Sequence, residues 1–176
     1  QLINNENSSS FYVIGISYRK ADAKLRGSFS LSPTKRANLL SKAKSIGIEG
    51  LLATSTCNRT EIYGLVDNPT ILIDLLCENT GGNKKSFNDV AYILKDKEAI
   101  SHMFRVGAGL DSQILGDFEI ISQIKTAAKI SKKYKLLDAF LERLVNSVLQ
   151  ASKQIKNETK LSSGATSVSF ASAQYL

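Results

Sequence analysis

The chain has 176 residues, enough for one ordinary domain or one domain with an appendage, and its 43% hydrophobic and 22% charged content is typical of a soluble globular protein. Its apolar runs are far shorter than a membrane-spanning helix, and two cysteines with one histidine disfavour both a disulfide framework and a zinc site. The net charge of +7 is concentrated in residues 121–160, which favours either a polyanionic partner such as RNA or a solvated lysine-rich surface.

Strand and helix signals alternate along the first half of the chain. Runs rich in β-branched and aromatic residues predict strands, and Ser32 before Pro33 predicts a helix start that Gly47 ends. The predicted elements are strand 11–18, helix 33–46, strand 50–55, strand 60–66, a helix from Asn68-Pro69 and strand 90–94, with 19–29 and 78–89 as connections.

This β-α-β-β-α-β order predicts an α+β, ferredoxin-like antiparallel sheet with two helices on one face and the first and third strands in the centre. After Lys95 the pattern is helical: Asp96 is a candidate cap, and periodic segments follow near 118–134 and 136–158. The predicted organisation is a disordered tail (1–10), a ferredoxin-like part (11–95), a helical part (96–160) and the start of a further long helix (161–176).

The stretch "ATSTCNRTEIYG" (53–64) places Cys57 on a polar turn between two predicted strands. A partly exposed cysteine near Arg59 and free backbone N–H groups can be a nucleophile, because the thiolate is the reactive form. The alternative is a small residue that packs the turn. Cys77, between Leu76 and Glu78 on a predicted helix, is interpreted as a packing residue.

His102 and Arg59 are the other candidates for chemistry. His102 is the single histidine and therefore the natural proton shuttle, or else a satisfied residue on an apolar helix face. Arg59 can bind a carboxylate in bidentate fashion, or form a structural ion pair with Glu61 or Asp111. The chain has no GxGxxG motif and no phosphate-binding loop, so a nicotinamide dinucleotide site of the usual kind is not expected.

Two motifs together resemble the glutamyl-tRNA reductase family: "STCNRTEIY" (55–63) and "SHMFRVGAGLDSQILGD" (101–117). Residues 14–32 are similar to the N-terminal block of that family, and residues 164–173 are similar to the start of its long spinal helix.

The resemblance implies a mechanism for the site. Cys57 would attack the ester of glutamyl-tRNA to form a thioester, which NADPH would reduce to glutamate-1-semialdehyde for tetrapyrrole and heme biosynthesis. His102 would assist proton transfer, and Arg59 would pair with the substrate carboxylate. The remaining residues implied near the glutamyl group are Thr56, Asn58, Ser112, Asp117 and Glu119, the last two in a segment where the sequence departs from the usual family pattern.

The resemblance also implies partners and a compartment. NADPH would be bound by a domain that this chain lacks, no metal is expected, and the chain alone would be at most an esterase. We expect the full-length protein to be a homodimer and this fragment to be a monomer. We also expect a glutamate-1-semialdehyde aminomutase to act downstream. The expected location is the cytoplasm or a plastid stroma, without membrane attachment. The competing hypotheses are an RNA-binding ferredoxin-like module, and a cysteine hydrolase unrelated to tRNA that needs a third group to orient His102.

Overall fold

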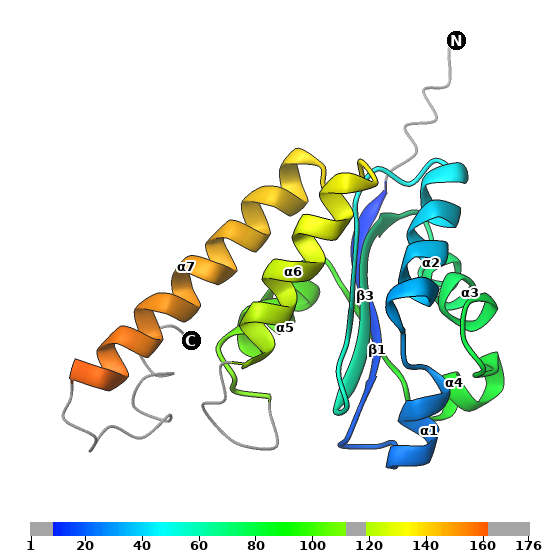
Figure 1. Ribbon diagram of the computed structural model, residues 1–176, viewed down its shortest axis with the longest axis horizontal. Helices are drawn as coiled ribbons and strands as arrows, with labels where there is room; N and C mark the ends of the chain where they lie inside the picture. The colour runs from blue at the N-terminus through cyan, green and yellow to red at the C-terminus, as the bar shows by residue number, and fades with distance from the viewer. Residues whose placement is uncertain (1–8, 112–118, 162–176) are drawn as a thin grey trace, which may run out of the picture.

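The computed structural model describes residues 9–111 and 119–161, which form a central sheet between two layers of helices (Figure 1). Residues 1–8 of the tail predicted at 1–10 lie outside the described residues, and Ser10, which the prediction placed in the tail, is the first residue of β1. The predicted segment 161–176 lies outside the described residues beyond Leu161. In chain order the elements are β1 (Ser10–Ser17), α1 (Ala23–Ser28), α2 (Pro33–Ser45), β2 (Leu51–Ser55), β3 (Arg59–Val66), α3 (Thr70–Glu78), α4 (Lys84–Val90), β4 (Tyr92–Lys95), α5 (Lys97–Gly107), α6 (Glu119–Lys133) and α7 (Ala139–Leu161).

The sheet has the strand order β2-β3-β1-β4, and every pairing within it is antiparallel. The predicted ferredoxin-like arrangement is therefore confirmed, with β1 and β3 in the centre. The register places Gly15 of β1 opposite Glu61 on one side and Tyr92 on the other. This row of three residues crosses the sheet where the candidate site lies.

Helices cover both faces of the sheet, whereas the sequence predicted helices on one face and left the position of the helical part open. Figure 1 shows α1–α4 on one side and α5–α7 on the other. The central strand β1 explains this, because Ile14 and Ile16 pack under α2 and α3 while Phe11 and Val13 pack under α5–α7. None of the helices in the described parts of the chain is long and apolar enough to cross a membrane.

Local signals set most element boundaries. The Ser32 hydroxyl accepts a hydrogen bond from Lys35 N at 3.2 Å, and Pro33 is the first residue of α2, as predicted. Gly47, just beyond the end of α2, has a φ of +90°, a left-handed conformation that glycine adopts without the penalty that a Cβ brings.

Two predicted connections contain short helices, α1 and α4. Each has a side-chain cap, with Asp22 accepting from Leu25 N at 2.8 Å and Asn83 accepting from Ser86 N at 2.9 Å. Helices of 6 and 7 residues are too short to show a clear apolar period, so only the caps signalled them. Because α4 extends to Val90, the last strand begins at Tyr92, two residues later than predicted.

Asp96 stands at the N-terminal boundary of α5, but its side chain does not cap the helix. Its carboxylate instead accepts a hydrogen bond from Phe11 N at 3.0 Å. The predicted cap is therefore wrong in its partner: Asp96 ties the start of β1 to the end of β4 and so helps position α5 against the sheet.

Candidate active site

Cys57 lies at the tip of the β2–β3 hairpin, on the turn that the sequence predicted. Its side chain is exposed, so of the two alternatives left open by the sequence the structure favours an accessible thiol over a residue that packs the turn. Thr56 closes the turn: its hydroxyl accepts hydrogen bonds from the backbone N–H groups of Asn58 and Arg59, both at 3.3 Å. From the outside, Arg26 Nε donates to the Cys57 carbonyl at 2.9 Å. The thiol is therefore accessible while its backbone is held from two sides.

Arg59 begins β3 and is almost completely buried. Its Nη2 donates to the backbone carbonyl of Asp111 and, at 3.0 Å, to Asp111 Oδ2. Its Nη1 lies 3.7 Å from Glu61 Oε2 and, within the described residues, has no hydrogen-bond partner. Burial alone would lower the pKa of Arg59, but the charges of Glu61, Tyr92 and Asp111 and the hydrogen bond to Asp111 outweigh burial and raise it. The guanidinium is thus a fixed cation held by two carboxylates, and its Nη1 has no hydrogen-bond partner among the described residues.

Glu61 is the centre of a buried polar network, and its side chain is only 1% exposed. Tyr63 donates to Oε1 at 3.1 Å, Tyr92 donates to Oε2 at 2.6 Å, and His102 Nε2 is hydrogen-bonded to the same Oε2. Burial alone would raise the pKa of Glu61, but the hydrogen bond and charge of His102, together with Arg59 and Tyr92, lower it. Glu61 is therefore an ionised acceptor at neutral pH.

Gly15 makes the contact between Tyr92 and Glu61 possible. It stands between them in the same cross-strand row, so the phenol must pass over β1 to reach the carboxylate. A Cβ placed on Gly15 would lie 2.7 Å from the Tyr92 hydroxyl oxygen. The absence of a side chain at this position is therefore a requirement of the network.

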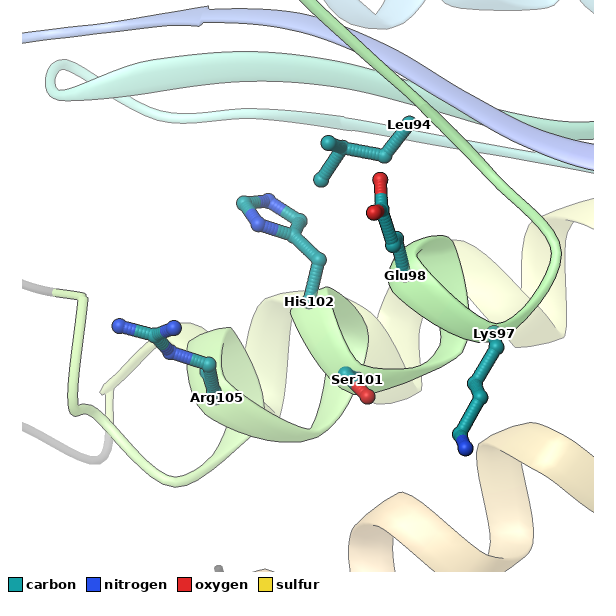
Figure 2. Close-up of a pocket in the computed structure, with 6 residues that line it drawn as sticks. All are labelled: Leu94, Lys97, Glu98, Ser101, His102 and Arg105. Atoms are coloured by element: carbon teal, nitrogen blue, oxygen red, sulfur yellow. The ribbon is translucent and has the colours of Figure 1, made fainter.

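His102 projects from α5 toward the sheet, as Figure 2 shows, and its side chain is 13% exposed. Its ring centroid lies 5.0 Å from that of Tyr92. The open side of the imidazole lines a pocket of about 380 Å³, whose other lining residues are Leu94, Lys97, Glu98, Ser101 and Arg105. One edge of His102 is thus hydrogen-bonded to a buried carboxylate and the ring is also accessible to a ligand.

Residues 14–159 match the family model described as "Glutamyl-tRNAGlu reductase, N-terminal domain". The chain belongs to this family. It is 62% identical over 173 residues to glutamyl-tRNA reductase 2 of Flavobacterium johnsoniae, covering 98% of this chain and 40% of that protein. It is 64% identical over 166 residues to glutamyl-tRNA reductase of Christiangramia forsetii, covering 94% of this chain and 40% of that protein.

A solved structure, glutamyl-tRNA reductase from Methanopyrus kandleri, superposes with a TM-score of 0.71 at 26% identity, covering 89% of this chain and 37% of that one. The chain thus spans about 40% of the length of the family members it matches.

The structure brings together some of the residues that the sequence predicted for the site. Arg59 and His102, far apart in sequence, both contact Glu61. Thr56 and Asn58 shape the turn that carries Cys57. The predicted residues Ser112 and Asp117 lie outside the described residues, and Glu119 is described only as the first residue of α6.

The sequence offered Glu61 and Asp111 as ion-pair partners of Arg59, and the structure shows both pairs. Sequence reasoning missed the bond between Glu61 and His102, and it missed Tyr63 and Tyr92 as parts of the candidate site. One available signal was the two-residue period of the predicted strand, which puts Arg59, Glu61 and Tyr63 on a single face. Cys77, by contrast, packs half-buried against the core as predicted, and burial, followed by Asp74, raises its pKa.

Neither a metal site nor a dinucleotide site is evident in the parts of the chain that the structure describes. Those residues contain no group of three or more His, Cys, Asp or Glu suited to a metal ion. All strand pairings in the described sheet are antiparallel, so the parallel strand–glycine loop–helix unit that usually holds a nicotinamide dinucleotide has no counterpart there. The described residues therefore do not fit NADPH.

Proposed function

We propose that this chain carries the acylation half of a glutamyl-tRNA reductase, with Cys57 as the nucleophile. The observation that carries the proposal is the exposed thiol at the tip of the β2–β3 hairpin, whose second strand continues into Arg59 and Glu61 and so connects to His102. Membership of the glutamyl-tRNA reductase N-terminal family supports the choice of acyl donor.

The proposed step is a transesterification onto sulfur. The Cys57 thiolate attacks the ester carbonyl of glutamyl-tRNA, a C–S bond forms and the bond between that carbon and the ribose oxygen breaks. The ribose oxygen leaves as an alkoxide and takes up a proton, which gives the free hydroxyl of the tRNA. His102 is the proposed group that accepts and returns this proton. Water hydrolyses the thioester slowly, which gives free glutamate and regenerates the thiol.

Arg59 is the proposed partner of a substrate carboxylate. Its cation is fixed by Asp111 and Glu61. Its buried Nη1 has no hydrogen-bond partner among the described residues and can donate a hydrogen bond to an oxygen of the substrate carboxylate. Thr56 and Asn58 on the hairpin turn are proposed to complete the glutamyl site. Ser112, Asp117 and Glu119 remain proposals that come from the family motif.

The complete reductase activity is proposed for the whole protein. NADPH would supply the hydride that converts the thioester to glutamate-1-semialdehyde for tetrapyrrole synthesis, and an aminomutase would use that aldehyde. Because the described residues do not fit NADPH, we assign its binding to parts of the protein outside them. We further propose a dimer for the whole protein, a monomer for this chain alone, and a location in the cytoplasm or a plastid stroma.

The proposed tRNA-binding surface is the basic side of α6 and α7, which lie next to one another (Figure 1). Exposed Lys125, Lys129 and Lys132 follow one side of α6 at helical spacing and line a groove of about 190 Å³ against α7. Lysine side chains arranged in this way suit the phosphate backbone of an RNA helix, whose contacts are electrostatic.

A purely RNA-binding module is disfavoured by the fold. RNA-recognition domains of ferredoxin-like topology stack bases on aromatic residues of an open sheet face. Here Phe11 and Tyr63 on the central strands are buried beneath α5–α7, and the opposite face lies beneath α2 and α3. The competing cysteine hydrolase unrelated to tRNA needs a third group that orients His102, and Glu61 is hydrogen-bonded to His102. That contact suits either hypothesis, and the family match favours glutamyl-tRNA as the acyl donor.

A single-turnover assay with glutamyl-tRNA carrying labelled glutamate, without NADPH, tests the proposal. We expect label on the protein or free labelled glutamate with the wild type and with Cys77→Ser, and neither with Cys57→Ser. Cys77→Ser is the matched control because Cys77 packs on α3 away from the hairpin. A wild-type chain that binds the tRNA without deacylating it, or a Cys57→Ser variant that still retains label, would overturn the proposal.

A further inference from the structure

We propose that Tyr92 and Glu61 are positioning residues that hold His102 with its Nε2–H toward Glu61, so that Nδ1 is the nitrogen that exchanges protons with the reacting groups. The inference deepens the proposed acylation function, because it names the residues that orient the proposed proton carrier. It rests on hydrogen-bond geometry within a buried cluster drawn from β3, β4 and α5.

The Glu61 carboxylate has little freedom to turn. Tyr63 donates to one of its oxygens, and Tyr92 and His102 are bonded to the other, so any rotation of the carboxylate breaks at least one of these bonds. Both phenols remain donors at neutral pH, since burial, followed by the nearby Glu61 charge, raises the pKa of each well above its ordinary value. Glu61 is therefore a fixed acceptor and never a donor under working conditions.

A fixed acceptor determines the tautomer of the histidine. An ionised carboxylate can only accept, so the Nε2 of His102 must carry hydrogen whether the ring is neutral or charged. In the neutral ring Nδ1 then holds the free lone pair. Among the described residues Glu61 is the hydrogen-bond partner found for His102, which leaves Nδ1 available for a substrate or a thiol. A carboxylate that orients a histidine for nucleophilic catalysis in this way recurs on unrelated folds.

The Tyr92 hydroxyl helps to hold Glu61 Oε2 beside His102. Its hydroxyl reaches Glu61 only because Gly15 leaves space above β1, and its ring lies beside the imidazole. Loss of the hydroxyl would free Oε2 to move away from His102, whereas the bond from Tyr63 to the other oxygen would remain. Tyr92→Phe is therefore the mildest change that tests orientation without removing the proposed proton carrier.

The test uses the fact that the chain has one histidine, so ¹⁵N-histidine labelling gives a single imidazole in the NMR spectrum. With the ring titrated to its neutral form, we expect the wild type to show the Nε2–H tautomer and Tyr92→Phe to show a mixture of tautomers. In the single-turnover assay, Tyr92→Phe should slow acylation about tenfold while the affinity for glutamyl-tRNA is unchanged. Tyr12→Phe, which removes a phenol hydroxyl on the other face of β1, is the control expected to change neither readout.

An Nδ1–H tautomer in the wild-type chain would overturn the inference, and so would a Tyr92→Phe variant with unaltered tautomer and acylation rate. The spectrum of the wild type does not depend on catalysis or on any variant folding. A chain that shows the expected tautomer but does not deacylate glutamyl-tRNA would therefore contradict the proposed function and leave the positioning geometry supported.

Discussion

Replacing Gly15 with alanine should destabilise the protein through one identifiable contact. The new Cβ would lie 2.7 Å from the Tyr92 hydroxyl oxygen and 2.8 Å from Cζ, closer than real Cβ contacts allow. The phenol must therefore move, and its 2.6 Å hydrogen bond to the buried Glu61 carboxylate is lost. Overpacking costs about 1–3 kcal/mol, and a hydrogen bond to a charged group contributes about 1.5–3 kcal/mol, so we expect a loss of about 3 kcal/mol.

The measurement is the free energy of unfolding from urea titrations, in a double-mutant cycle with Tyr92→Ala. In the Tyr92→Ala background the clash and the hydrogen bond are both absent, so Gly15→Ala should be neutral or slightly stabilising, because alanine loses less backbone entropy than glycine. Gly27→Ala on α1 is the matched control, since a Cβ there meets no atom within 4 Å. An equal cost of Gly15→Ala in both backgrounds would refute the assignment of Gly15 to the Tyr92 path.

Three further predictions follow from the site and the basic surface. Cys57 should react with a maleimide faster than Cys77, whose pKa burial raises, and equal labelling by mass spectrometry would contradict the exposed hairpin thiol. The folded state lowers the pKa of Glu61 from its ordinary value of 4.5. The ionised carboxylate therefore stabilises the fold fully above pH 4.5, and this stabilisation is lost as the pH falls through the pKa of the folded state. The urea midpoint of Glu61→Gln should therefore vary less below pH 4.5 than that of the wild type. Lys129→Ala should weaken tRNA binding and reduce the slope of log affinity against log salt by about one, whereas Lys84→Ala on α4 should not, and equal slopes would exclude this face of α6.

The framework of the sheet was accessible from local sequence patterns. The β-branched and aromatic run at 11–18 predicted a strand, which the structure confirms as β1. Its burial between two helical layers was found only in the structure. The Ser32-Pro33 pair predicted the start of α2, and the polar stretch around Cys57 predicted the hairpin. These features depend on neighbours in the chain, which is why a linear reading found them.

Short or dual-purpose elements were harder to predict. Helices α1 and α4 contain less than two full turns each, so their apolar spacing was indistinguishable from that of a loop. Asp96 stands where a capping residue belongs, yet its carboxylate binds Phe11 N on a strand that lies 85 residues away in sequence. A local rule identified the position, and a distant backbone group determined the partner.

The sequence by itself determined that Cys57 stands on a turn between two strands and that the chain resembles the glutamyl-tRNA reductase family. Only the tertiary structure showed that Glu61 joins Arg59, Tyr92 and His102, because Tyr92 and His102 follow Glu61 by 31 and 41 residues and lie on β4 and α5. Their meeting depends on the antiparallel register, on the packing of α5 against the sheet and on the missing side chain of Gly15. Hydrogen bonds of this kind are set by the distance between atoms in space, which the spacing of residue types along a chain does not encode.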